Sequence, residues 1–253
     1  MKVLVNGQLI EYKQEGGGKA VLLLHGWGTS LASFDKVAAH LVKKGYQVTR
    51  FDFPGFGGSP VPATDWSVGD YVALTAAFVQ KMKITHLYAV MGHSFGGRVI
   101  IKGVGTGALQ PEKVVLMGAA GIKPKKTAKK VAFQAIAKTG KAVTSLPGLA
   151  GVRRTLQASL YAVAGSTDYL QSGPLKQIFL NTINEDLQQY LPNMQQPALL
   201  VWGEHDTETP LKDGKKMHDQ LPNSQLMVVP GAGHFSFDDD LGAVMAAVDG
   251  FLA

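Results

Sequence analysis

The stretch Gly92-His93-Ser94-Phe95-Gly96-Gly97 constrains this chain more than any other. It follows an apolar run, residues 84–91, that favours a β-strand, and it leads into a helix-compatible run that continues through Ile101. Between a strand and a helix, the serine of a Gly-x-Ser-x-Gly turn is held in a strained backbone conformation, so only small neighbours fit around it. The pattern therefore predicts a sharp turn that exposes the Ser94 hydroxyl, an arrangement termed a nucleophile elbow.

Apolar and helix-compatible runs alternate along most of the chain. Strands are predicted at 20–24, 47–51, 84–91, 113–118, 197–202 and 225–229, and helices by the intervening patterns at about 31–44, 67–82, 210–220 and 239–252. Residues 3–12, with Asn6-Gly7 between two short runs, predict an N-terminal hairpin. This alternation predicts an α/β fold in which a mostly parallel, doubly wound sheet is covered by helices on both faces.

Residues 121–191 interrupt the alternation. The interval is too long for a crossover connection, and it holds two helix-compatible stretches, 128–139 and 152–163, without a clear buried strand. We expect it to be a helical cap inserted into a core domain formed by residues 1–120 and 192–253. Because ligands in open α/β sheets bind at the carboxyl ends of the strands, a cap that leaves the strand at 113–118 would cover that edge.

The net charge of +6 originates in the same interval. Residues 121–191 hold ten Lys or Arg and three Asp or Glu, so the interval carries +7 and the rest of the chain −1. A solvated helix face is the simplest explanation of such a cluster, and an anionic substrate or acidic lipid head groups are the alternatives. We expect no nucleic-acid partner, and the pattern leaves the oligomeric state open.

Several classes of protein are excluded by what the sequence lacks. With no Cys, the chain forms neither disulfides nor Cys-based metal sites. No apolar run approaches the roughly 20 residues that span a bilayer, and the N-terminus has a strand pattern rather than a secretion signal. We therefore expect a soluble, cytoplasmic protein without stable membrane insertion. There is no phosphate-binding loop and no metal-ligand spacing of His, so neither a cofactor nor a metal is expected.

Five motifs, each after a predicted strand, occur in the order found in the α/β-hydrolase superfamily. They are His25-Gly26-Trp27-Gly28, residues 52–59, residues 92–97, Gly203-Glu204-His205-Asp206 and Gly231-Ala232-Gly233-His234. The chain resembles this superfamily over nearly its whole length apart from the cap, in its cap-bearing, carboxylesterase-like branch. The resemblance implies the α/β-hydrolase fold and a serine hydrolase that cleaves carboxylic esters of small molecules through an acyl-enzyme intermediate.

The predicted base follows from the chemistry of serine. A serine hydroxyl is a weak nucleophile at neutral pH, so Ser94 needs an imidazole within hydrogen-bond reach. Of the seven His, only His25, His93, His205 and His234 lie in loops after strands. His93 adjoins Ser94, where its side chain would point away from the hydroxyl. His234 stands on a Gly-rich loop after the last strand and is the predicted base.

An acid must hold that imidazole in the productive tautomer. Asp206 matches the family's motif, and Ser, then Asp, then His is the chain order that this fold uses. By position in the chain, Glu204, Glu208 and Asp238 are the alternative acids.

The oxyanion of a tetrahedral intermediate needs preorganised amide donors. The backbone N–H groups of Trp27 and Phe95 are the predicted pair. Residues on the same loops are predicted to line the substrate pocket: His25, Gly26, His93 and Phe235. The resemblance also implies that His25 orders its loop, and Asp52 is expected to be structural.

Two alternatives remain beside the esterase. Carbon–carbon bond hydrolases of ring-fission diketones resemble this layout closely, although the Trp that commonly follows their catalytic His is replaced here by Phe235-Ser236-Phe237. A catalytically idle protein that keeps the fold as a ligand receptor is the second alternative. Dehalogenase and epoxide-hydrolase chemistry is disfavoured because those relatives carry Asp at the position of Ser94. Aminopeptidase chemistry is disfavoured because the cap is basic.

Overall fold

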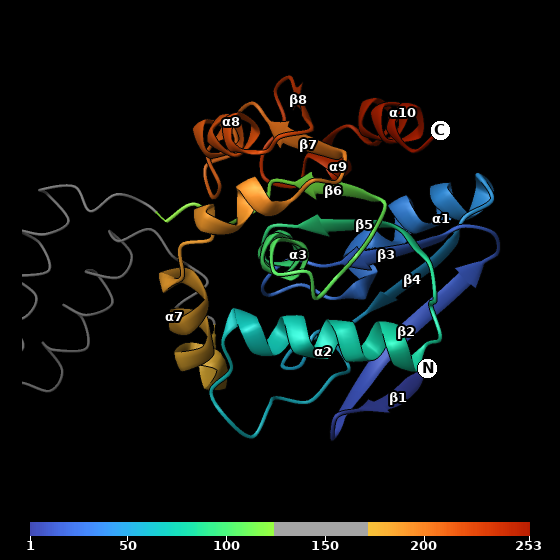
Figure 1. The fold of residues 1–253 in the computed structure, drawn as a ribbon, viewed down its shortest axis with the longest axis vertical. Coiled ribbons are helices and arrows are strands. Elements are labelled where there is room, and N and C mark those ends of the chain that lie inside the picture. Colours follow the sequence, from blue (N-terminus) through green and yellow to red (C-terminus); the bar gives the residue numbers. More distant parts are fainter. Residues whose placement is uncertain (124–171) are drawn as a thin grey trace, which may run out of the picture.

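The computed structural model describes residues 1–123 and 172–253, and these form one sheet with helices on both faces (Figure 1). The strands are β1 (Lys2–Val5), β2 (Gln8–Gly16), β3 (Ala20–Leu24), β4 (Gln47–Phe51), β5 (Leu87–His93), β6 (Lys113–Met117), β7 (Ala198–Gly203) and β8 (Ser224–Val229). They are ordered β1-β2-β4-β3-β5-β6-β7-β8. Only the β1–β2 and β2–β4 pairs are antiparallel. The predicted mostly parallel, doubly wound sheet is confirmed.

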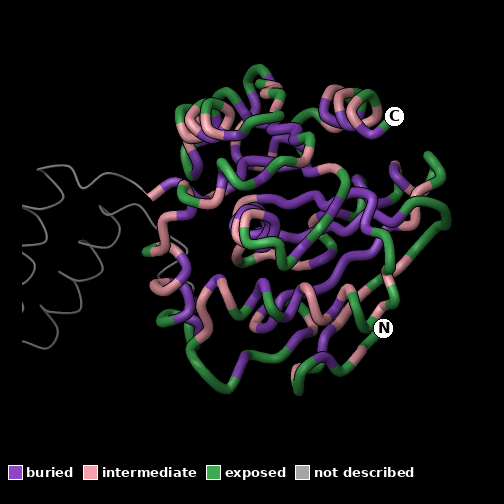
Figure 2. The backbone as a smooth tube through the Cα atoms, viewed as in Figure 1, coloured by how far each residue is buried: buried purple, intermediate pink, exposed green. Residues whose placement is uncertain are grey.

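Each face of the sheet has its own layer of helices. The layers are α1 (Asp35–Lys43), α9 (Ser236–Asp239) and α10 (Leu241–Leu252) on one face, and α2 (Val68–Lys81), α3 (Phe95–Gly105) and α8 (Leu211–Gln220) on the other. Phe34, Leu41 and Val248 belong to the core of the first layer, and Tyr71 and Trp202 to that of the second. Because the central strands are covered on both faces, their residues are almost all buried (Figure 2).

The N-terminal hairpin forms as predicted but continues further. Val5 pairs with Gln8 across a two-residue turn in which Asn6 and Gly7 have φ of 48° and 80°, values that suit Asn-Gly. The sequence pattern ended the second strand at Tyr12, whereas β2 runs to Gly16. The extra residues are exposed or half-buried, and they are strand because they pair with β4, a tertiary contact that local periodicity does not reveal.

Local capping explains where two helices begin. Ser67 and Asp70 form a capping box at the start of α2, which matches the predicted helix at 67–82. The helix predicted at about 239–252 is observed as α10, which begins at Leu241 directly after the short α9. Asp240, with φ −140° and ψ 77°, ends α9 and caps α10 by accepting a hydrogen bond from the Ala243 N–H at 2.9 Å.

Part of the predicted cap lies outside the described residues. This part includes the helices expected at 128–139 and 152–163. The described end of the interval contains α7 (Lys176–Asn184), between the 3-10 helices η2 (Gly173–Leu175) and η3 (Gln188–Asn193). Arg98 and Lys102 of α3 hold this end through the backbone oxygen (3.0 Å) and the carboxylate (2.6 Å) of Glu185. The cap boundaries at 121 and 191 stay a prediction.

A membrane-spanning helix is not found in the described ranges, where each helix is too short or too polar to cross a bilayer.

Candidate active site

Ser94 stands at a sharp turn between β5 and α3. Its φ of 50° and ψ of −107° are rare for a residue with a side chain, and such strain costs about 1–3 kcal/mol. Two backbone bonds hold the turn: the Ser94 N–H donates to Met117 at 3.1 Å, and the Ser94 carbonyl accepts from Ala120 at 3.0 Å. At Gly96 a Cβ atom would collide with the backbone of β3. The predicted strained turn is therefore present, and it requires glycine at this position.

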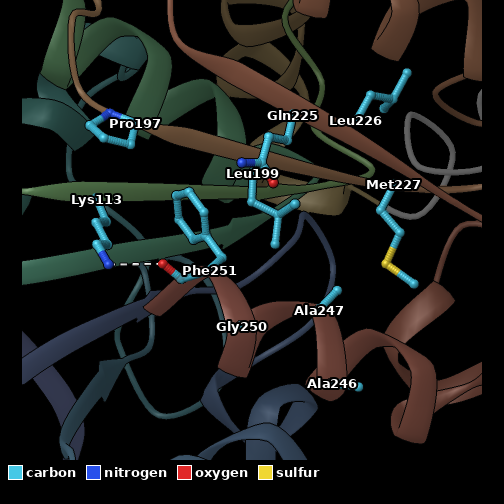
Figure 3. A pocket seen from close by; sticks show the side chains of 10 residues that line it. All are labelled: Lys113, Pro197, Leu199, Gln225, Leu226, Met227, Ala246, Ala247, Gly250 and Phe251. Carbon is cyan, nitrogen blue, oxygen red and sulfur yellow. Dashed lines mark hydrogen bonds between the residues drawn. The ribbon is translucent and has the colours of Figure 1, made fainter. Parts of the chain in front are cut away.

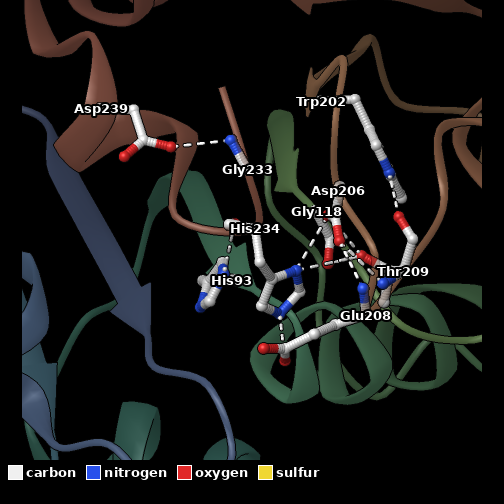
Figure 4. Close-up of polar contacts among 9 residues, drawn as sticks. All are labelled: His93, Gly118, Trp202, Asp206, Glu208, Thr209, Gly233, His234 and Asp239. Carbon is white, nitrogen blue, oxygen red and sulfur yellow. Dashed lines mark hydrogen bonds and ion pairs between the residues drawn. The ribbon is translucent and has the colours of Figure 1, made fainter. Parts of the chain in front are cut away.

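His234 and Asp206 meet at the carboxyl ends of β7 and β8. His234 Nδ1 lies 2.9 Å from Asp206 Oδ2, and both side chains are buried (Figure 4). The other carboxylate oxygen, Oδ1, accepts hydrogen bonds from the backbone N–H groups of Glu208 and Thr209, each at 2.9 Å. Burial raises the pKa of Asp206, but the hydrogen bonds from His234 and Thr209 outweigh it and hold that pKa below its usual value. The acid is therefore ionised at neutral pH and oriented toward the imidazole.

Thr209 adds a hydroxyl to this pair. Its Oγ1 lies 2.8 Å from Asp206 Oδ2 and 2.9 Å from the carbonyl oxygen of Gly118. Gly118 follows β6 with φ 47°, and a Cβ atom there would approach Asp206 Oδ2 to 3.2 Å. Thr209 thus links Asp206 to Gly118, the residue that follows β6.

The second ring nitrogen of His234 faces Glu208. Glu208 Oε2 lies 3.4 Å from His234 Nε2, and its side chain is 57% exposed. Across the described residues, no hydrogen bond to Ser94 Oγ is found. In this arrangement, then, each ring nitrogen of His234 has a carboxylate beside it, one buried and one exposed.

His25 and Asp52 order the loop that carries Trp27. His25 Nδ1–H donates to Gly26 O at 2.7 Å, and His25 Nε2 accepts from the Phe53 N–H at 3.0 Å. Burial lowers the pKa of His25 to about 4, so the ring is neutral and connects Gly26 to Phe53 through these two hydrogen bonds. Asp52 accepts from backbone N–H groups on both neighbouring loops, at 2.6 and 2.8 Å. Within the described residues, no hydrogen bond uses the backbone N–H of Trp27, which leaves it available to an oxyanion.

His93 lies behind Ser94 and is almost fully buried. Its Nε2–H donates to the carbonyl oxygen of His234 at 3.0 Å, and its ring packs 4.6 Å from that of Phe235. Burial lowers the pKa of His93 to about 3, so the ring is neutral. The ring thus packs against the loop that carries His234 and Phe235.

A cavity of about 230 Å³ opens beside Trp27. Its walls come from the oxyanion loop, the loop after β4 and the chain that returns from the cap: Trp27, Gly28, Gly55, Phe56, Ser172, Pro174 and Leu175. The Trp27 ring also contacts those of Phe56 and Phe95 at centroid distances of 4.9 and 5.4 Å. Of the residues predicted for substrate contact, the structure puts Trp27 in this wall, whereas His25, Gly26, His93 and Phe235 are not among its lining.

A larger cavity, of about 540 Å³, lies at the opposite end of the sheet (Figure 3). It is bounded by the beginnings of β6, β7 and β8 and by α10, so it lies away from the carboxyl ends of the strands, where the Ser94 turn and the contact between His234 and Asp206 lie. Lys113 is the ionisable group in its lining, and its Nζ is occupied by the carbonyl oxygens of Phe251 and Ala253 at 2.8 and 3.0 Å. This cavity offers no nucleophile and is not a candidate active site.

Sequence reasoning missed Thr209 and Gly118. The signal for Thr209 was present: an Asp at the end of a strand, followed three residues later by Thr, is the pattern of a turn in which the carboxylate accepts backbone N–H groups. Gly118 carried no such signal, because its proximity to Asp206 arises from the pairing of β6 with β7.

Residues 21–248 match the model of the alpha/beta hydrolase family. YugF, an uncharacterized hydrolase of Bacillus subtilis, is 28% identical over 241 residues, which cover 88% of this chain and 86% of that protein. A 2-hydroxy-6-oxononadienedioate/2-hydroxy-6-oxononatrienedioate hydrolase of Burkholderia vietnamiensis is 25% identical over 262 residues, with coverage of 90% and 85%.

Among solved structures, an esterase from Exiguobacterium antarcticum superposes with a TM-score of 0.77 at 22% identity, covering 99% of this chain and 98% of that one. At this identity the similarity establishes a shared fold.

Proposed function

Because the chain belongs to the alpha/beta hydrolase family, we propose that it is a serine hydrolase that cleaves carboxylic esters of small molecules through an acyl-Ser94 intermediate. The observation that carries the proposal is the 2.9 Å contact between His234 Nδ1 and Asp206 Oδ2 at the edge of the sheet where the Ser94 turn lies. A buried carboxylate on one ring nitrogen leaves the other, Nε2, as a base or acid for the reaction.

In the acylation step, His234 Nε2 accepts the proton of Ser94 Oγ as that oxygen attacks the ester carbonyl carbon. The oxyanion of the tetrahedral intermediate accepts hydrogen bonds from the N–H groups of Trp27 and Phe95. When the carbon–oxygen bond to the alcohol breaks, His234 Nε2–H gives its proton to the departing oxygen. Water then attacks the acyl-Ser94 ester with His234 as base, releasing the acid and restoring the hydroxyl.

We assign the acyl group to the cavity beside Trp27. Its walls are mostly apolar, through Trp27, Phe56 and Leu175, and apolar walls suit a hydrocarbon chain. A volume of about 230 Å³ favours short or medium acyl chains over long ones.

A carbon–carbon bond hydrolase is the second candidate, and one observation favours it. Curated relatives from Pseudomonas and Burkholderia vietnamiensis, 23% and 25% identical, are named as 2-hydroxy-6-oxononadienedioate/2-hydroxy-6-oxononatrienedioate hydrolases. The same three side chains could act on a ring-fission diketone, so substrate specificity has to be measured.

The test is a panel of p-nitrophenyl esters of increasing acyl length, assayed beside a ring-fission diketone with wild-type protein, Ser94→Ala and Ser33→Ala. Ser33, in the 3-10 helix Leu31–Phe34, donates its hydroxyl to the nearby Ser30 carbonyl oxygen and controls for loss of a hydroxyl. We expect ester turnover to fall by about six orders of magnitude in Ser94→Ala and to persist in the control. Near-normal esterase activity in Ser94→Ala contradicts the proposal, and turnover of the diketone alone moves the function to carbon–carbon hydrolysis.

A further inference from the structure

Glu208 and Asp206 place carboxylates on opposite nitrogens of one imidazole. Asp206 Oδ2 lies 2.9 Å from His234 Nδ1, and Glu208 Oε2 lies 3.4 Å from Nε2 (Figure 4). Asp206 is buried and fixed by four hydrogen bonds, whereas the side chain of Glu208 faces solvent. The two carboxylates therefore have different roles: Asp206 orients the imidazole ring, and Glu208 is exposed to a bound substrate.

The backbone of Glu208 is held in place although its carboxylate is not. Its N–H donates to Asp206 Oδ1 at 2.9 Å, which fixes the Cα atom within the turn. Among the described residues, the carboxylate of Glu208 has His234 as its one ionic partner. Asp213 differs, because Lys212 and Lys216 are near enough to oppose the rise in its pKa that burial causes. Within the described residues, Glu208 is thus a carboxylate beside the proposed reaction centre that no Lys or Arg pairs with.

The leaving group of an ester must come to the same nitrogen. As His234 Nε2–H protonates the departing alcohol oxygen, that oxygen has to lie within about 2.6–3.2 Å of Nε2. Glu208 Oε2 is already 3.4 Å from Nε2. The alcohol portion of the substrate, and not the acyl portion beside Trp27, therefore passes next to the Glu208 carboxylate.

We propose that Glu208 determines leaving-group specificity by selecting esters whose alcohol carries a positively charged ammonium group and by disfavouring alcohols that carry a carboxylate. The inference rests on the proposed ester hydrolysis and names its substrate class. The basic composition of residues 121–191 suggests the opposite, an anionic substrate. A comparison of cationic and anionic esters therefore decides between the two hypotheses.

The test uses three acetate esters that share one acyl group: acetylcholine, its uncharged isostere 3,3-dimethylbutyl acetate, and 4-acetoxybutanoate. We expect kcat/KM for the cationic ester to exceed that for the neutral one by about three- to tenfold, the effect of unit charges roughly 6 Å apart in a partly hydrated site. In Glu208→Gln this preference should disappear and the anionic ester should gain relative to the other two. Raising the salt concentration should reduce the wild-type preference.

Two variants control for other effects. Glu112→Gln removes the same charge from an exposed glutamate that pairs with His86, and it should keep the wild-type ratios. Glu208→Asp should retain part of the preference. A purely structural role of Glu208 would lower all three rates together without changing their ratios. Unchanged ratios in Glu208→Gln, or a wild-type preference for the anionic ester, overturn the inference. If no ester shows Ser94-dependent turnover, the proposed function itself fails.

Discussion

The Nε2–H of His93 donates to the carbonyl oxygen of His234 across 3.0 Å, so the residue before the proposed nucleophile holds the backbone of the proposed base. Within the described residues, Nδ1 of His93 has no hydrogen-bond partner, and it faces Gly26, where a Cβ atom would approach it to 2.8 Å. The buried ring therefore lies between the base and the oxyanion loop, and its protonation would disturb both.

This burial makes folding stability depend on pH. Burial lowers the pKa of His93 from 6.5 to about 3, so the unfolded chain binds a proton below pH 6.5 that the folded protein does not. The contribution is fully present above pH 6.5 and is lost as the pH falls toward 3. Between pH 7 and pH 5 we expect His93 to account for about 2 kcal/mol of lost unfolding free energy.

Urea unfolding at the two pH values measures this loss. His93→Asn should show a pH-dependent loss that is smaller by about that amount, 2 kcal/mol. His205→Asn, at a side chain that is 69% exposed, should leave the loss unchanged. The same loss in wild type and in His93→Asn would contradict the assignment.

Thr209 supplies a hydroxyl that both Asp206 and Gly118 use. Because the hydroxyl carries one proton, replacing Thr209 by Val keeps the shape but removes the single donor that these two buried oxygens share. We expect kcat/KM on a p-nitrophenyl ester to fall about tenfold and unfolding free energy to fall by about 1–2 kcal/mol. Thr209→Ser should preserve both quantities, and equal values for Val and Ser would show that the hydroxyl is dispensable.

Leu175 should set the length of the acyl chain. It forms one wall of the cavity beside Trp27 and packs close to Gly55. Leu175→Trp should move the optimum of the ester panel to shorter chains, because the larger ring fills the cavity, and Leu175→Ala should move it to longer ones. Leu109→Ala removes an equally buried leucine away from this cavity and should leave the length profile unchanged while lowering stability by about 2–5 kcal/mol. Identical profiles in all variants would place the acyl group elsewhere.

Local sequence patterns were sufficient to predict most strands of the sheet. The strand at 20–24 begins and ends where a continuous apolar run does, because most residues covered on both faces of a sheet are apolar. Pairing between strands far apart in the chain could not be predicted from these local patterns. β2 extends to Gly16 through pairing with β4.

The candidate site shows the same division. The strained turn at Ser94 and the positions of Asp206 and His234 at the ends of strands could be predicted, because each lies in a motif that needs a particular backbone geometry, such as glycine where a Cβ atom would clash. The approach of Glu208 to His234 Nε2 could not, because it depends on which way an exposed side chain turns. The sequence placed Glu208 only among the alternatives to Asp206, and the geometry gives it the opposite ring nitrogen.

The sequence predicts a structural role for Asp52, and substitution of this residue tests it. Its Oδ1 accepts from the Leu31 N–H at 2.6 Å and its Oδ2 from the Gly58 N–H at 2.8 Å, so one carboxylate joins the loop that carries Trp27 to the loop after β4. Asp52→Ala leaves both N–H groups without their acceptor. We expect a loss of about 3 kcal/mol in unfolding free energy, since each bond to a charged acceptor contributes about 1.5–3 kcal/mol before relaxation.

Asp52→Asn should have an intermediate effect, because its amide oxygen can accept only one of the two hydrogen bonds and its NH2 group faces the other N–H. Its unfolding free energy, measured in urea, should therefore lie between those of wild type and Asp52→Ala. Esterase kcat should fall in the same order, because a looser loop presents the Trp27 N–H less accurately to the oxyanion. Wild-type stability in Asp52→Ala, or a lost kcat with unchanged stability, would indicate that Asp52 acts in the chemistry rather than through the two loops it joins.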